Sequence, residues 1–186
     1  MDVGRVIRLM WMLVLTIWAI AAEYENGLIE KRDWRSEAAV VVVGLGWVLL
    51  LLRRLPVVAD WQIVPSVVWL RLAGLAITVA GLVFALWARY HLGRNWDAYI
   101  TLKKDHQLVR TGPYALVRHP IYSGFMLASI GTALAFGWLR CFIAAALIIS
   151  VWTYKSGLEE LFLIDHFGEQ YRQYRLNVKR LIPFVW

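Results

Sequence analysis

The residues best placed for chemistry lie around a histidine at a rigid corner of the chain. His119 stands between Arg118 and Pro120, and a second proline, Pro113, lies a few residues earlier. Proline lacks a backbone N–H and fixes φ, so neither proline belongs in the middle of a helix. Pro120 suits the first turn of a helix that continues through Ile121. His119 is therefore expected at a helix start near the membrane surface, where its side chain can be aimed at a ligand.

A pair of carboxylates, Glu159 and Glu160, follows a later apolar run. Such a pair is typical of a solvated helix face, but carboxylates at a membrane boundary usually have a partner or a function. Lys155 lies one helical turn before Glu159, which places the two on one face. They form either an ordinary surface ion pair or a charged pair that faces a cytoplasmic cavity. Glu160, on a different helical face, is expected to tolerate substitution better.

Composition places the chain among membrane proteins. Of its 186 residues, 60% are hydrophobic, and 11 are tryptophans, which favour the membrane–water interface. The formal charge of +7 comes mostly from residues between apolar runs, which fits topology signals and anionic lipid headgroups better than nucleic acid. The single cysteine, Cys141, cannot form an internal disulfide or a multi-cysteine metal site. We expect membrane lipids as partners, with no nucleic acid and no metal.

Five apolar stretches predict an all-α integral membrane protein with about five transmembrane helices. They are Val6–Ala22, Ala38–Leu52, Val67–Ala88, Ile121–Trp138 and Cys141–Tyr154. A spanning helix needs about 20 residues, so flanking residues must lengthen the second and fifth stretches. Ala19-Ile20-Ala21 resembles a cleavage site, which leaves a signal peptide as an alternative to a retained first helix.

The basic residues predict which end of these helices faces the cytoplasm. Most of them fall in Glu23–Glu37, Arg89–Arg118 and the C-terminal tail, which five helices place on one side. The positive-inside rule assigns that side to the cytoplasm. Past Tyr154 the fifth helix should continue as an amphipathic end, stop near Gly168 and lead into a short tail helix that folds back.

The combination of these motifs resembles a known family of membrane enzymes. Arg118-His119-Pro120-Ile121-Tyr122, followed after one helical hairpin by Glu159-Glu160, is similar to the R-H-P-x-Y segment and later E-E pair of the isoprenylcysteine carboxyl methyltransferases. Further family-like segments stand in the same order: Leu92–Trp96, His106–Val109, Gly112–Tyr114, Phe167–Tyr171 and Arg180–Pro183. The likeness covers about half of the chain and is of the prokaryotic type.

The resemblance implies an S-adenosylmethionine site. Its implied contacts are His106, Gln107, Leu108 and Val109 around the adenosyl group, Tyr114, His119, Pro120, Ile121 and Tyr122 along the rest of the wall, and Glu159 at the amino-acid end. Lys155 and Glu159 are the implied catalytic residues. The family has an arginine where this chain has Lys155; arginine grips a carboxylate through two parallel bonds, whereas lysine is a point charge. The prenylcysteine substrate therefore does not follow from the resemblance.

We predict one domain, 1–186, with three helices in 1–88 and a cytoplasmic cofactor-binding loop, catalytic part and helical tail in 89–186. The predicted function is S-adenosylmethionine-dependent methyl transfer to a small amphiphilic or lipid-like acceptor, in the prokaryotic inner (plasma) membrane with the site facing the cytoplasm. Transfer from a sulfonium is an in-line displacement, which alignment of the reactants alone can accelerate. Two alternatives stay open: an NADPH-dependent membrane sterol or steroid reductase, and a non-enzymatic membrane protein.

Overall fold

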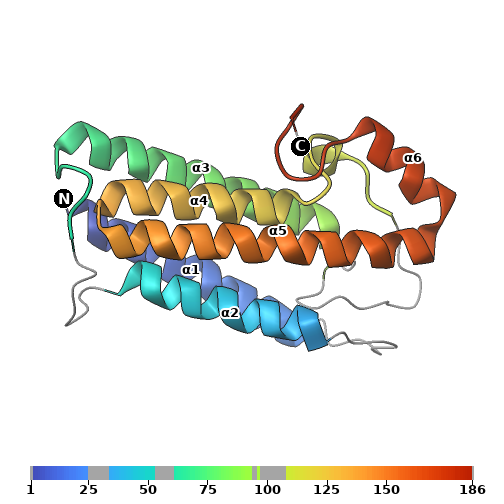
Figure 1. Ribbon diagram of the computed structural model, residues 1–186, viewed down its shortest axis with the longest axis horizontal. Coiled ribbons are helices and arrows are strands. Elements are labelled where there is room, and N and C mark those ends of the chain that lie inside the picture. The colour runs from blue at the N-terminus through green and yellow to red at the C-terminus, as the bar shows by residue number, and fades with distance from the viewer. Residues whose placement is uncertain (1, 25–33, 53–60, 94–95, 97–107, 186) are drawn as a thin grey trace.

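Long helices lie side by side along the length of the molecule (Figure 1). The computed structural model describes residues 2–24, 34–52, 61–93, 96 and 108–185. Within these residues the elements are α1 (Val3–Tyr24), α2 (Trp34–Leu51), α3 (Val68–Leu92), the 3-10 helix η3 (Gly112–Ala115), α4 (Pro120–Phe136), α5 (Leu139–Phe167) and α6 (Glu169–Asn177). The predicted all-α membrane architecture is confirmed.

Helix length and composition make the chain a multi-pass membrane protein. Among the described residues, α1, α2, α3 and α5 are long and apolar enough to cross a membrane, whereas α4 has only 17 residues. The two stretches that looked too short are lengthened as expected: α2 begins at Trp34, and α5 continues to Phe167 before Gly168 ends it with a positive φ of 54°. The stretch that begins at Ile121 stops earlier than expected, because Gly137 adopts the left-handed conformation.

Helices α3 and α4 approach so closely that their backbones touch. A Cβ atom added to Gly124 of α4 would lie 2.6 Å from the carbonyl oxygen of Gly81 and 2.7 Å from the amide nitrogen of Ala85, both on α3. A Cβ on Gly131 would lie 2.5 Å from the amide nitrogen of Thr78. Small residues at such crossings let membrane helices pack through backbone contacts. This contact fixes α4, and with it the His119 corner, against α3.

Gly124→Ala should therefore lower the free energy of unfolding by about 1–3 kcal/mol, since the added methyl must push two backbones apart. Gly44→Ala is the matched control, because nothing lies within 4 Å of a Cβ at that position. It should raise stability by about 0.5–1 kcal/mol, the helix preference of alanine over glycine. Unfolding in mixed detergent micelles measures both variants. Equal effects at the two glycines would contradict the tight α3–α4 crossing.

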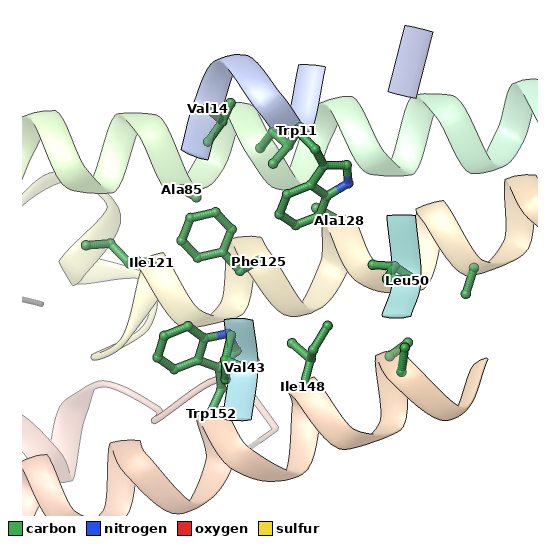
Figure 2. Packing of buried hydrophobic residues seen from close by; sticks show 14 of the residues in the cluster. Trp11, Val14, Val43, Leu50, Ala85, Ile121, Phe125, Ala128, Ile148 and Trp152 are labelled. Carbon is green, nitrogen blue, oxygen red and sulfur yellow. The ribbon is translucent and has the colours of Figure 1, made fainter. Parts of the chain in front are cut away.

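Aromatic side chains fill the centre of the bundle, and Figure 2 shows those of Trp11, Phe125 and Trp152. Trp11 of α1 is fully buried and stacks with Phe125 of α4 at 6.0 Å between ring centroids. Trp47 of α2 lies 5.1 Å from Phe125, and Trp152 of α5 lies 6.4 Å from it. The reading of the tryptophans as interfacial residues is thus wrong for Trp11 and Trp152, while Trp61, on the connection before α3, is exposed as expected.

The C-terminal segment folds back over one end of the bundle, as the sequence predicted. In Figure 1, α6 and the last residues lie beside η3, at the end opposite the N-terminus. Tyr171 and Tyr174 of α6 are buried, and the Tyr174 hydroxyl donates a 2.5 Å hydrogen bond to the carbonyl oxygen of Tyr114 in η3. Leu181 is also buried, whereas Phe184 is almost fully exposed. This segment completes the surroundings of His119.

Candidate active site at the His119 corner

The corner that carries His119 is fixed by backbone pairing with the C-terminal segment. Pro120 occupies the first turn of α4, and His119 precedes it with a φ of −123°. The amide of Arg118 donates a 2.8 Å hydrogen bond to the carbonyl oxygen of Lys179. The amide of His119 donates a 3.1 Å hydrogen bond to the carbonyl oxygen of Arg180. One turn on, the Ser123 hydroxyl donates to the carbonyl of Leu181 at 2.6 Å. Residues sixty apart in sequence thereby hold the histidine in place.

Glu160 lies in a buried ion-pair cluster beside this corner. Its Oε1 accepts a 2.7 Å hydrogen bond from Arg118 Nε and lies 2.5 Å from Arg118 Nη2. Its Oε2 lies 3.4 Å from Arg175 Nε, and its Oε1 lies 3.5 Å from His119 Nε2. The side chain is only 6% exposed. Glu160 therefore does not lie on a solvated helix face, and its burial argues against the expectation that it tolerates substitution better than Glu159.

Glu159 faces a different environment, although it contacts the same histidine. Its Oε2 accepts a 2.8 Å hydrogen bond from the Tyr122 hydroxyl and lies 3.4 Å from His119 Nδ1. About a third of the side chain, 32%, remains exposed, against 6% for Glu160. One glutamate is thus buried in an ion-pair cluster, and the other keeps about a third of its side chain exposed.

An aromatic stack continues from His119 into the bundle. The His119 and Tyr122 rings are nearly parallel, with centroids 5.5 Å apart, and Tyr122 stacks in turn on Trp152 at 4.4 Å. Lys155 is 2% exposed, and its Nζ lies 5.7 Å from the centre of the Tyr122 ring and 5.4 Å from that of Trp152. Lys155 is therefore a buried cation beside the stack, and the reading as an ordinary surface ion pair is wrong.

Two carboxylates control the protonation of His119. Burial alone would lower its pKa, but Glu159 and Glu160 outweigh burial and raise the pKa above the usual 6.5. Its two ring nitrogens face one carboxylate each, with Nδ1 3.4 Å from Glu159 Oε2 and Nε2 3.5 Å from Glu160 Oε1, so both glutamates favour the protonated ring.

The raised pKa predicts how stability depends on pH. A group with a raised pKa in the folded state stabilises fully below its unfolded pKa, and this contribution is lost as pH rises through the folded pKa. Thermal unfolding in detergent should therefore show a loss of stability above about pH 6.5 that His119→Gln removes. The quantity to compare is how the thermal stability of each protein, wild type and His119→Gln, changes with pH. Parallel profiles for wild type and His119→Gln would show that folding does not change the pKa of this histidine.

The structure describes five of the other residues predicted for the cofactor. Tyr114 is buried in η3, and burial is the main cause that raises the pKa of its hydroxyl. Pro120 and Ile121 are buried at the start of α4, and Leu108 and Val109 are half-buried. His106 and Gln107 lie outside the described residues.

Several residues of the cluster were given no role from the sequence. Arg118 stands inside the recognised motif, yet its partner Glu160 is 42 residues away. Trp152 could have been found, because it precedes Lys155 by three residues and so shares its helical face. Arg175 and the paired carbonyls of the C-terminal segment give no periodic signal, since they act through an irregular chain path.

Comparisons with known proteins find membrane methyltransferases among the proteins similar to this chain. The family model "Phospholipid methyltransferase" (PEMT) matches residues 69–170, more than half of the chain. The protein-S-isoprenylcysteine O-methyltransferase of Homo sapiens is 33% identical over 130 residues, which are 67% of this chain and 45% of that protein. The protein-S-isoprenylcysteine O-methyltransferase B of Arabidopsis thaliana is 32% identical over 124 residues, 63% of this chain and 61% of that protein.

A solved structure shares the fold. The eukaryotic intramembrane Ras methyltransferase ICMT (isoprenylcysteine carboxyl methyltransferase) matches with a TM-score of 0.55 and 27% identity, over 81% of this chain and 51% of that one. The chain thus spans about half the length of the curated relatives it matches. The resemblance seen in the sequence is confirmed. With its R-H-P-x-Y corner and glutamate pair inside the matched region, the chain belongs to the phospholipid methyltransferase family.

Proposed function

We propose that this protein is an integral membrane methyltransferase that uses S-adenosylmethionine and methylates an amphiphilic, lipid-like acceptor. One observation carries the proposal: Glu159, whose side chain is partly exposed, lies where the apolar bundle ends, with its carboxylate beside Tyr122 and His119. A polar cofactor and an apolar acceptor can both reach such a position. Family membership and the likeness to isoprenylcysteine methyltransferases support the same activity.

The residues around Glu159 fit the charges of this cofactor. Both of its contacts in the cluster, with Tyr122 and His119, use Oε2. The exposed part of the carboxylate suits the cationic amino group of an amino acid, and the Tyr122 hydroxyl keeps the carboxylate oriented. Tyr114, Pro120 and Ile121 would complete the wall, with Leu108 and Val109 along the adenosyl side. The resemblance adds His106 and Gln107 to this set.

The protein's own task is alignment and exclusion of water. The cofactor supplies an electrophilic methyl group on a positively charged sulfur. A carboxylate acceptor would need no general base, so the protein's residues would only have to hold it in line with that methyl group. Lys155 is positioned to attract an anionic acceptor, and the aromatic stack keeps water away from the reacting atoms. We assign the catalytic roles to Lys155 and Glu159 on this basis.

Cofactor binding separates this proposal from its rivals. Isothermal titration of the purified protein should detect binding of S-adenosylmethionine and of its demethylated product, with no binding of NADPH. Binding of NADPH alone would favour a reductase. A protein that binds none of the three would be a non-enzymatic member of the fold.

We also propose that the His119 corner faces the cytoplasm of a prokaryotic inner (plasma) membrane, with the whole chain acting as one domain. Cysteines placed at the exposed positions Ala115 and Ser66 in a Cys141→Ala background should then be labelled from opposite sides. Ser66 lies at the end of the bundle that carries the α4–α5 turn, where Gln62 pairs with Trp138. In intact cells an impermeant maleimide should label only the cysteine at Ser66. Labelling of both positions from outside would contradict this topology.

A further inference from the structure

The last residues that the structure describes form a β-turn with a large aromatic side chain at its tip. The amide of Val185 donates a 3.2 Å hydrogen bond to the carbonyl oxygen of Ile182, which closes the turn. Pro183 takes the second position, and Phe184 takes the third with a φ of 64°. Glycine or asparagine usually holds this third position, because a bulky residue rarely adopts a positive φ. Phe184 therefore occupies the turn at a conformational cost.

Burial within the described part of the molecule does not offset this cost. Phe184 is 91% exposed, and the other apolar residues of the turn, Ile182 and Val185, are 47% and 73% exposed. Leu181, directly before the turn, is buried. Large apolar side chains exposed side by side mark a surface that meets another apolar phase. The turn thus presents its apolar side chains to something outside the chain.

The turn lies at the level where the apolar bundle begins. In Figure 1, whose horizontal direction is the long axis, the C-terminal end of the chain is level with the start of α4, while α6 and the end of α5 extend further along that axis. Helix α4 starts with Pro120, next to the His119 corner at the end of the membrane-spanning part. Apolar side chains at this level meet the boundary between acyl chains and headgroups.

The segment that leads into the turn is basic. From 169 to 185 the sequence has one acidic residue, Glu169, and four basic residues, which are Arg172, Arg175, Lys179 and Arg180. Lys179 is exposed and lies nearer the turn than the two arginines of α6. Basic side chains beside apolar ones are the combination that binds a bilayer surface with anionic headgroups. Charge and position together therefore favour lipid as the partner of the turn.

We propose that the turn Ile182–Val185 is an interfacial anchor: its apolar side chains, with Phe184 foremost, insert into the leaflet on the side of the His119 corner, and Lys179 lies against anionic headgroups. The anchor supports the corner, because the backbone just before the turn pairs with it. The carbonyl oxygen of Lys179 accepts the hydrogen bond from the amide of Arg118. Lipid that holds the turn thereby keeps this pairing closed. The anchor does not depend on the reaction proposed above.

A spin label measures whether the turn enters the bilayer. In a Cys141→Ala background, the label is attached to Val185→Cys, to Val83→Cys, which is 58% exposed on α3, or to Gln173→Cys, which is exposed on α6. Each protein is placed, one copy per disc, in nanodiscs of phosphatidylcholine and phosphatidylglycerol. At Val185, as at Val83, dissolved oxygen should relax the label more than a water-soluble nickel chelate does. At Gln173 the chelate should be the more effective reagent.

The same label measures the contribution of the basic side chain. Lys179→Gln should lower the ratio of inserted to water-exposed label at Val185 roughly fivefold in the anionic discs, the usual effect of one basic residue near such a surface. The substitution should change nothing in discs of phosphatidylcholine alone. It leaves the backbone carbonyl of Lys179, and so the pairing with Arg118, in place.

Phe184→Asn separates membrane insertion from the geometry of the turn. Asparagine adopts a positive φ more readily than phenylalanine, so the turn itself should be favoured. Because the ring is lost, however, hydrogen exchange of the Arg118 and His119 amides in nanodiscs should become roughly tenfold faster, at the low end of the effect of burying a phenylalanine. Phe184→Leu is the matched control: it keeps an apolar side chain, and its exchange should stay close to that of wild type.

Three results would overturn the anchor: a Val185 label that the chelate reaches as easily as at Gln173, a ratio that Lys179→Gln leaves unchanged in anionic discs, or amides that exchange in Phe184→Asn as slowly as in wild type. A label shielded from both reagents only in discs with two copies would assign the turn to a second copy and not to lipid. These measurements contain no cofactor, so failure of the anchor is distinguishable from failure of the proposed methyl transfer.

Discussion

Replacing Arg118 with methionine should lower the free energy of unfolding by about 3–5 kcal/mol, because Glu160 then stays buried without its main partner. Arg118 contacts Oε1 of Glu160 through two nitrogens, at 2.7 and 2.5 Å, and the side chains are 8% and 6% exposed. Arg175 cannot take its place, since it is 42% exposed and lies 3.4 Å from the other oxygen. Arg118 also donates to the carbonyls of Arg175 and Val178, so the C-terminal segment should loosen as well.

Denaturant unfolding in mixed micelles measures this loss, and limited proteolysis reports release of the C-terminal segment. Arg172→Met is the matched control: Arg172 and Glu169 are 3.7 Å apart but 62% and 67% exposed. Exposed pairs of this kind contribute about 0–1 kcal/mol. The double variant Arg118→Met/Glu160→Gln should recover part of the stability, because it removes the orphaned charge. A loss in Arg118→Met no larger than in Arg172→Met would contradict a buried role for the pair.

The membrane helices could be predicted from the sequence because each one coincides with a continuous run of apolar residues. The stop at Gly168 and the start at Pro120 were also readable, since glycine and proline act on the backbone locally. The close contact of α3 with α4 could not be predicted from the sequence. It depends on which glycines of two helices meet, and Gly81 and Gly124 carry no mark in the sequence that distinguishes them from Gly44, which touches nothing.

The candidate site was predictable in part, for the same reason. His119, Tyr122 and Glu159 meet as their recognised motifs implied, with Tyr122 bonded to Glu159 at 2.8 Å. The division of labour between the two glutamates was not predictable, because helix periodicity gives only their directions. Burial of Glu160 depends on Arg118 and on the C-terminal segment. This segment pairs with the His119 corner although it lies about sixty residues later in the sequence. The buried tryptophans were likewise misread, since composition alone favours the interface for this residue type.

Glu159→Gln should weaken binding of S-adenosylmethionine roughly 10- to 150-fold, the range for loss of a hydrogen bond to a charged group, about 1.5–3 kcal/mol. The substitution keeps the shape of the side chain and removes its charge. The fold should tolerate it, because the side chain is 32% exposed and the glutamine oxygen can accept the hydrogen bond from Tyr122. Isothermal titration measures the affinity, and thermal unfolding verifies that the protein remains folded.

The two neighbouring glutamates should separate affinity from stability in the same experiment. Glu160→Gln removes the partner of Arg118 and His119 in a buried cluster, so its main effect should be on unfolding, with cofactor affinity falling less than in Glu159→Gln. Glu169→Gln, at an exposed position of α6, should change neither quantity. If Glu159→Gln binds S-adenosylmethionine as wild type does while remaining folded, the amino-acid end of the cofactor is held elsewhere. The Glu159 carboxylate would then bind a different ligand, and its contacts with Tyr122 and His119 would stabilise the fold alone.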